Sequence, residues 1–375
     1  MKKYISIILT FIFTFSIIAT ASAESTTNKP VTFIESMENL LKFSNYKSTE
    51  KFFGGLKVST YGKDNINGSF GLSVTSSNYK KANYEFDGDS YIQGSIVLYD
   101  NSKDKSFDQL ICNVRGKLIY IVNDGLYGRL DDINILARGI PKSDEASYNN
   151  FQKSFKKEIS KIKGKWYYLP TGDLTTLNED AYAELPEEFR KYADQKALMK
   201  ELKEKGLKKF YADLVKDLID NLKDDMGITE SEVKIYKQVI DDFFATQFFG
   251  KRKVESGEFK GQTSFNLNKF SVINFVKKIA GGLNEEMSVQ DIASLKYYLN
   301  LFSLSGFYHE DFVNRIIDQF RVTFTLKNIQ NLEKFEVAYS QQISDINTLK
   351  GIEKPSSFTS LEKTINDLNT SYMGF

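Results

Sequence analysis

The chain has 375 residues, with 50 Lys and Arg against 49 Asp and Glu, one His and one Cys. This balance lacks the basic face on which nucleic-acid binding depends, and a single cysteine, Cys112, excludes an internal disulfide. One His and one Cys also fall short of the three or four nitrogen and sulfur ligands of the usual zinc sites. We therefore expect no nucleic-acid partner, no metal and no cofactor.

The first 23 residues have the pattern of a secretory signal peptide. Lys2 and Lys3 precede an apolar run from Ile5 to Ile18, and small residues end at Ala23. That run is shorter than the ~20 residues that cross a bilayer, although an uncleaved N-terminal anchor is the alternative. We predict cleavage after Ala23, export to the periplasm or cell exterior, and membrane association that is at most peripheral.

Residues 24–178 are predicted to form an N-terminal helix and an antiparallel β-meander. Apolar residues at helical spacing place the helix at 33–43. From about 52 to 136 the period becomes two, which predicts short strands with one apolar face and one face rich in Ser, Lys and Asp. Asn67-Gly68 predicts a type I′ turn, and the stretch 87–90 is interpreted as turn residues.

A second helix is predicted at 145–163, followed by a strand that contains the only tryptophan and ends at Pro170. In a strand, Trp166 and Tyr168 share a face and Tyr167 points to the opposite one. Three interpretations stay open for Trp166: it closes a core, it lines an apolar pocket, or it stacks on a sugar.

Residues 179–250 are predicted to be a helical insertion, and 251–375 a β/α part that completes the same sheet. The insertion ends in four aromatic residues, which are Phe243, Phe244, Phe248 and Phe249. In the last part, Ser288 and Asp291 predict a capped helix start. Alternating apolar residues then predict a hairpin between about 318 and 344.

No residue set meets the requirements of an enzyme site, so we expect a protein without catalytic residues. A secreted hydrolase would depend on the only histidine, His309, and the G-x-S-x-G motif is absent. His309 is interpreted as a surface residue at a helix start. Carboxylate doublets such as Asp131-Asp132 are expected by chance in a chain with 49 acidic residues and do not identify a glycosidase.

The order of segments resembles the LolA/LolB-like superfamily of exported carriers, which includes the LppX/LprG-type lipoproteins. The residues that carry the resemblance are the strands GKLIYIVN (116–123) and GKWYYL (164–169), the hairpin, and the late IEKP. The resemblance implies an α+β fold with a curved antiparallel β-sheet, an open half-barrel, wrapped around helices. It also implies that Leu118, Tyr120, Trp166 and Tyr168 lie on neighbouring strands.

The chain departs from that superfamily in two respects: it has no lipobox cysteine after the apolar run, and segment 179–250 is long. That segment is expected either to cover the concave face or to fill it. The first hypothesis is an exported, non-enzymatic protein that shelters a lipid acyl chain or a lipidated protein. The ligand would then contact Leu118, Tyr120, Trp166 and Tyr168 of the strands and the four phenylalanines at the end of the insertion. The alternative is a cell-surface structural or interaction protein with a filled core and a cell-envelope partner.

Overall fold

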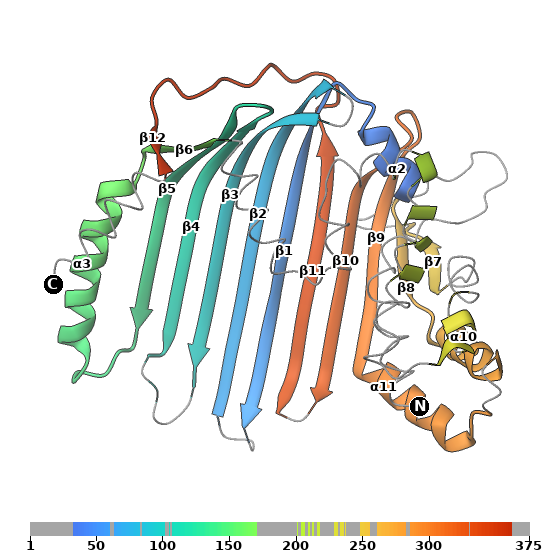
Figure 1. The fold of residues 1–375 in the computed structure, drawn as a ribbon. Helices are drawn as coiled ribbons and strands as arrows, with labels where there is room; N and C mark the ends of the chain where they lie inside the picture. The colour runs from blue at the N-terminus through green and yellow to red at the C-terminus, as the bar shows by residue number, and fades with distance from the viewer. Residues whose placement is uncertain are drawn as a thin grey trace. The chain divides into compact units, whose positions relative to one another are not determined.

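The computed structural model describes most of the chain between residues 33 and 361 (Figure 1). It describes residues 33–170 and 248–361 apart from short gaps, and isolated positions from 201 to 237; the gaps are 61–63, 83–84, 102–104, 106, 256–260, 283–285 and 330. The predicted signal peptide and most of the predicted helical insertion, with Phe243 and Phe244, lie outside the described residues.

The chain divides into two compact units. The larger unit comprises residues 42–179 and 318–375, and the smaller unit comprises residues 1–41 and 180–317. We predicted three parts that follow one another in the sequence, 24–178, 179–250 and 251–375. Each compact unit instead combines segments that are distant in the sequence. We describe each unit by itself.

Long antiparallel strands form the sheet of the larger unit (Figure 1). Its strands are β1 (Asn45–Thr60), β2 (Asp64–Ala82), β3 (Glu85–Asp100), β4 (Gln109–Ile121), β5 (Gly125–Arg138), β6 (Trp166–Pro170), β10 (Ile316–Ile329), β11 (Leu332–Ser344) and β12 (Thr359–Ser360). They are hydrogen-bonded in the order β12-β6-β5-β4-β3-β2-β1-β11-β10. All pairs with a recorded register are antiparallel except β12 with β6, so the predicted α+β class with an antiparallel sheet is confirmed.

The strands are longer than we expected, and the predicted turn at Asn67-Gly68 is wrong. The β1–β2 ladder continues until Thr60 pairs with Asp64, so Asn67 and Gly68 lie inside the ladder. Continued pairing brings the apolar side chain of Ile66 onto the same face as Phe70, which outweighs the local preference of Asn-Gly for a turn. The longest strand, β2, has 19 residues.

The stretch 87–90, which we expected to be a turn, also lies within a strand, β3. Asp87 is buried, forms an ion pair with Lys81 at 2.9 Å and accepts a hydrogen bond from the backbone N–H of Val122 at 2.9 Å. A buried carboxylate needs such partners. The acidic side chain is therefore held as part of the sheet.

Helix α3 (Glu145–Ile162) lies beside β5 where β6 stops pairing with it (Figure 1). The Tyr148 hydroxyl accepts a hydrogen bond from the Ala137 N–H at 2.8 Å, and the Gln152 amide donates to the Ile135 carbonyl. These side chains occupy the hydrogen-bonding groups that an edge strand otherwise leaves open. The helix and the strand at 166–170 were both predicted from sequence.

In the smaller unit the structure gives the bounds of three strands and three helices. They are α2 (Phe33–Leu40), β7 (Phe249–Lys253), β8 (Thr263–Leu267), α10 (Lys269–Gly282), α11 (Val289–Leu301) and β9 (Phe302–Asp311). Ser288 and Asp291 form the predicted capping box at the start of α11. Val272, Leu295 and Leu299 are almost fully buried, so α10 and α11 supply a compact core.

Helix α2, predicted at 33–43, joins the smaller unit through polar contacts. Its Ser36 hydroxyl accepts from the Ile317 N–H at 2.8 Å, and Glu35 forms an ion pair with Arg315 at 2.7 Å. Ser36 is buried, and Leu40 beside it is 4% exposed. Helix α2 is thus bonded to Arg315 and Ile317, which follow it in the sequence by about 280 residues.

Candidate apolar binding surface

Strand register in the larger unit places apolar side chains opposite one another across seven strands. Residues that face each other on neighbouring strands point to the same side of a sheet. One such row is Phe324, Val337, Gly54, Phe70, Ile96, Cys112 and Ile135. The next is Val322, Tyr339, Phe52, Leu72, Gly94, Val114 and Ile133. A third is Leu326, Phe335, Leu56, Gly68, Leu98, Leu110 and Ala137. We call these three rows the apolar face.

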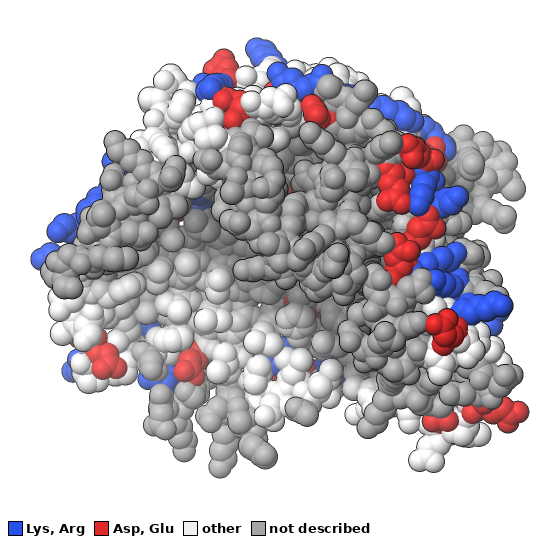
Figure 2. All heavy atoms as spheres, in the orientation of Figure 1, with Lys and Arg blue, Asp and Glu red and all other residues white. Residues whose placement is uncertain are grey.

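Large side chains of the apolar face, and of its neighbours on the same side of the sheet, remain well exposed. Their exposed fractions run from 38% to 49%, for Phe52, Leu56, Ile66, Leu72, Ile96 and Tyr120. In Figure 2 most of the described Lys, Arg, Asp and Glu side chains lie toward the margins of the view, and most other described atoms are uncharged. Contiguous exposed apolar side chains are uncommon on soluble proteins and mark interaction sites.

Glycines in the rows make room for aromatic neighbours. A Cβ atom on Gly54 would stand 2.7 Å from the Phe70 ring, and it would also meet the carbonyl oxygen of Glu336. The Phe70 ring therefore lies across Gly54 and contacts Phe52, with the two ring centroids 5.4 Å apart. This close approach holds the rings low against the sheet.

The opposite face of the same strands is polar and largely satisfied by its own pairs. Lys117 and Asp89 form an ion pair at 2.9 Å between β4 and β3. Asp132 forms ion pairs with Arg115 at 3.0 Å and with Lys163 at 2.7 Å. Hydrogen bonds from these cations, that of Lys163 first, lower the pKa of the Asp132 carboxyl group. We call this the polar face.

A β-bulge keeps the apolar side chains of β5 on one face. The β4–β5 register shifts between Arg115 and Gly116, so Asp131 has no partner in the ladder. The extra residue places Leu130 and Ile133 on the same side of the sheet although their numbers differ by three. The Asp131 carboxylate accepts a hydrogen bond from Arg129 at 2.6 Å. The Asp131-Asp132 doublet, which identified no site in the sequence, thus lies at this bulge.

The four strand residues predicted to contact a ligand do not lie together. Leu118 and Tyr120 belong to β4 and lie on the same side of the sheet as the apolar face. Trp166 and Tyr168 belong to β6 and lie on the polar face, because Tyr168 is opposite Tyr127, which is opposite Ile119. Strand β5 also lies between β4 and β6, so the implied neighbouring strands are a wrong prediction.

On the polar face, Trp166 and Tyr168 have partners within the protein. The Arg129 guanidinium lies 4.8 Å from the centroid of the Trp166 ring. Tyr168 packs against Tyr127 at 4.7 Å and Phe358 at 5.0 Å, and Tyr127 is fully buried. Tyr168, Tyr127 and Phe358 thus form a packed aromatic cluster, and the Trp166 ring lies against the Arg129 guanidinium.

A cation and a carboxylate complete this aromatic cluster. The Lys354 amine lies 5.3 Å from the Tyr127 ring centroid and 2.8 Å from an Asp124 carboxylate oxygen. Asp124 also accepts a hydrogen bond from the Tyr127 hydroxyl at 2.8 Å. The Lys354 hydrogen bond, opposed by desolvation, lowers the pKa of Asp124, while burial raises the pKa of Tyr127. The cluster ties residues 354–358 to β5 and β6.

Phe248 and Phe249 belong to the smaller unit, in and beside β7 rather than in the predicted helix. Phe248 is 2% exposed and packs edge-on against Phe275 at 5.2 Å, and Phe249 packs against Phe265 at 5.6 Å. They are core residues of that unit. His309 lies in strand β9, not at a helix start.

Burial shifts two titratable groups near β9. Burial raises the pKa of Tyr308 to about 12 and lowers the pKa of Lys251 to about 8. The Lys251 amine lies 5.9 Å from the Tyr308 ring centroid and has no hydrogen-bond partner. In the described part of the chain, no three His, Cys, Asp or Glu residues gather as a metal site would require.

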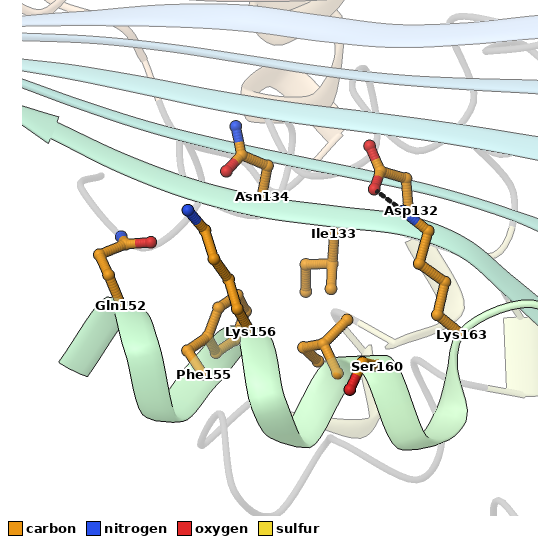
Figure 3. Close-up of a pocket in the computed structure, with 9 residues that line it drawn as sticks. Asp132, Ile133, Asn134, Gln152, Phe155, Lys156, Ser160 and Lys163 are labelled. Carbon is orange, nitrogen blue, oxygen red and sulfur yellow. Dashed lines mark hydrogen bonds and ion pairs between the residues drawn. The ribbon is translucent and has the colours of Figure 1, made fainter. Parts of the chain in front are cut away.

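A cavity of about 340 Å³ opens between α3 and β5 (Figure 3). Its apolar lining residues are Ile133 of β5 and Phe155 and Ile159 of α3. Its polar lining residues are Asp132, Asn134, Gln152, Lys156, Ser160 and Lys163. The helical period predicted α3, but its packing beside β5 depends on where β6 ends, so the sequence pattern alone gave no signal for this cavity.

No family model, curated protein or solved structure matches this chain. None of the helices that the structure describes is long and apolar enough to cross a membrane. The site must therefore be interpreted from its own geometry.

Proposed function

We propose that the protein is an exported, non-enzymatic carrier whose large sheet shelters an apolar ligand, such as a lipid acyl chain or the acyl chain of a lipidated protein. One observation carries the proposal: three apolar rows cross seven strands, and large side chains on their side of the sheet keep 38% to 49% of their surface exposed. The opposite face is polar, so the strands have one side suited to an apolar ligand.

The energy available to such a surface is sufficient without any catalytic group. Burial of one methylene group contributes ~0.8 kcal/mol. An acyl chain that buries about ten methylene groups would gain ~8 kcal/mol. That free energy, before the entropy cost of ordering the ligand is subtracted, corresponds to micromolar binding. The half-barrel form of the superfamily that the chain resembles, and export through the predicted signal peptide, belong to the same proposal.

Adjacent residues of β2 allow a matched test of this function. Leu72 is on the apolar face, and the next residue, Ser73, is on the polar face. We expect Leu72→Lys to weaken binding of 1-dodecanol at least tenfold, because an ammonium group would lie in the path of the chain. Ser73→Lys should leave the affinity unchanged. Titration calorimetry with the purified mature protein measures both.

Native mass spectrometry of protein purified from its own host gives an independent check. A retained lipid, absent from the Leu72→Lys variant, is the expected result. A protein that retains no lipid and does not bind 1-dodecanol would contradict the carrier function. The alternative of a structural or interaction protein would then be preferred, with the apolar face buried against another protein.

A further inference from the structure

The cavity between α3 and β5 combines apolar lining residues with cationic side chains. Ile133, which lines it from β5, is directly opposite Val114 and so stands at the end of one of the apolar rows. Phe155 and Ile159 face it from α3. A methylene chain leaving the cavity along Ile133 would therefore continue onto the apolar face.

The charges around the cavity favour an anion. Lys163 is already paired with Asp132, which also holds Arg115. Lys156 lines the same cavity and has no hydrogen bond or ion pair with any residue that the structure describes. In Figure 3 the Lys156 side chain extends from α3 toward β5. Arg115 and Lys163 are thus paired with Asp132, and the Lys156 charge is left for a ligand.

The size of the cavity limits what enters it. At about 340 Å³ it is near the lower end of the range for small-molecule sites. It therefore has room for a head group and the first methylenes, whereas a long chain must leave it.

We propose that this cavity is the head-group site of the ligand, and that the ligand is an anionic amphiphile whose carboxylate or phosphate pairs with Lys156 while its acyl chain lies along the apolar face. This inference rests on the proposed carrier function and adds the class of ligand. An uncharged or cationic lipid would leave the Lys156 amine without a counter-charge.

The test compares head groups on one chain length, using the full mature protein and ligand concentrations below those that form micelles. Dodecanoate and dodecyl phosphate should bind at least tenfold more tightly than 1-dodecanol. In Lys156→Gln this preference should disappear, while 1-dodecanol binds as it does to the unchanged protein. Lys156→Arg should restore the preference.

Lys153 provides the matched control, since it lies on the same helix, is exposed and does not line the cavity. Lys153→Gln should retain the full preference for the anionic ligands. Equal loss in both variants would show a general effect of charge on α3 and would overturn the proposal. Unchanged melting temperatures of both variants confirm that they are folded.

Three results separate this inference from the function on which it rests. Equal affinity for dodecanoate and 1-dodecanol overturns the head-group site and leaves the carrier function standing. Failure of every twelve-carbon ligand to bind contradicts the carrier function itself. Inorganic phosphate that binds as tightly as dodecyl phosphate, in a manner that depends on Lys156, shows an ion site and overturns the amphiphile.

Discussion

The two units bury their apolar side chains differently. In the smaller unit, α10 and α11 supply many nearly inaccessible residues, including Val272, Leu295 and Leu299. In the larger unit the apolar residues that are buried, among those the structure describes, are Ile119, Tyr127, Phe320, Ala338 and Ile343. The larger unit has long strands and three apolar rows, yet most of those side chains are only partly covered. Apolar composition alone thus does not separate a packed core from a partly covered sheet face.

A pair of Leu→Ala substitutions measures this difference most directly. Leu299 is fully buried, whereas Leu72 is 42% exposed on the apolar face. We expect Leu299→Ala to lower the free energy of unfolding by about 2–5 kcal/mol, because it leaves a cavity in a packed core. Leu72→Ala should cost less than about 1 kcal/mol. Urea denaturation measures both, and equal losses would show that the apolar face is a core.

Gly54 tests how tightly the rings of the apolar face lie against the sheet. A methyl group there would meet the Phe70 ring and the backbone of β11. We expect Gly54→Ala to lower the stability by about 1–3 kcal/mol, the usual cost of overpacking. Gly55→Ala, where the nearest atom would be 3.4 Å away, is the control. Equal effects would mean that the Phe70 ring moves aside freely.

Phe52 and Phe53 compare the two faces of β1 at adjacent positions. Phe52 is 43% exposed on the apolar face, and Phe53 lies on the polar face with the Arg321 guanidinium 4.9 Å from its ring centroid. We expect Phe52→Ala to weaken 1-dodecanol binding about tenfold, which corresponds to ~1.4 kcal/mol. Phe53→Ala should not change the affinity. Calorimetric titration measures both affinities. A larger loss of affinity in Phe53→Ala than in Phe52→Ala would mean that the polar face binds the ligand.

The smallest expected effect is the pH dependence of the aromatic cluster. The pKa of Asp124 is lowered from 3.8 in the folded state, so its ionised form stabilises the fold. That contribution is complete above the unfolded pKa and is lost as the pH falls through the folded pKa. Asp124→Asn should therefore be less stable than the parent above about pH 5, with a difference that shrinks below pH 3.8. Melting curves across this range are the measurement, and a difference independent of pH would contradict it.

Local patterns predicted most of the described elements. The period of two indicated the strands, the helical period indicated α3, and Ser288 with Asp291 indicated the start of α11. The Asn67-Gly68 turn failed because long-range pairing of β1 with β2 outweighed a local preference. Phe249 failed for a similar reason, since its pairing with Leu267 places it in a strand.

The candidate site was only partly accessible from sequence. Trp166 and Tyr168 were rightly expected to share one side of a strand, and in the structure Leu118 and Tyr120 share one side of β4. Their separation onto opposite sides of the sheet depends on the register through β5, which pairs with both β4 and β6. Lys156 was not identified, because a lysine on an amphipathic helix resembles any other solvated lysine until the neighbouring strand is known.

The sequence by itself determined which residues of one strand point the same way, because side chains alternate along an extended backbone. Only the tertiary structure decided which faces of different strands coincide, because hydrogen-bond register and the bulge at Asp131 are set by pairs of segments. It therefore joined Ile133 to Val114 and Leu72 in one apolar row. It also placed Trp166, the only tryptophan, on the other side of the sheet.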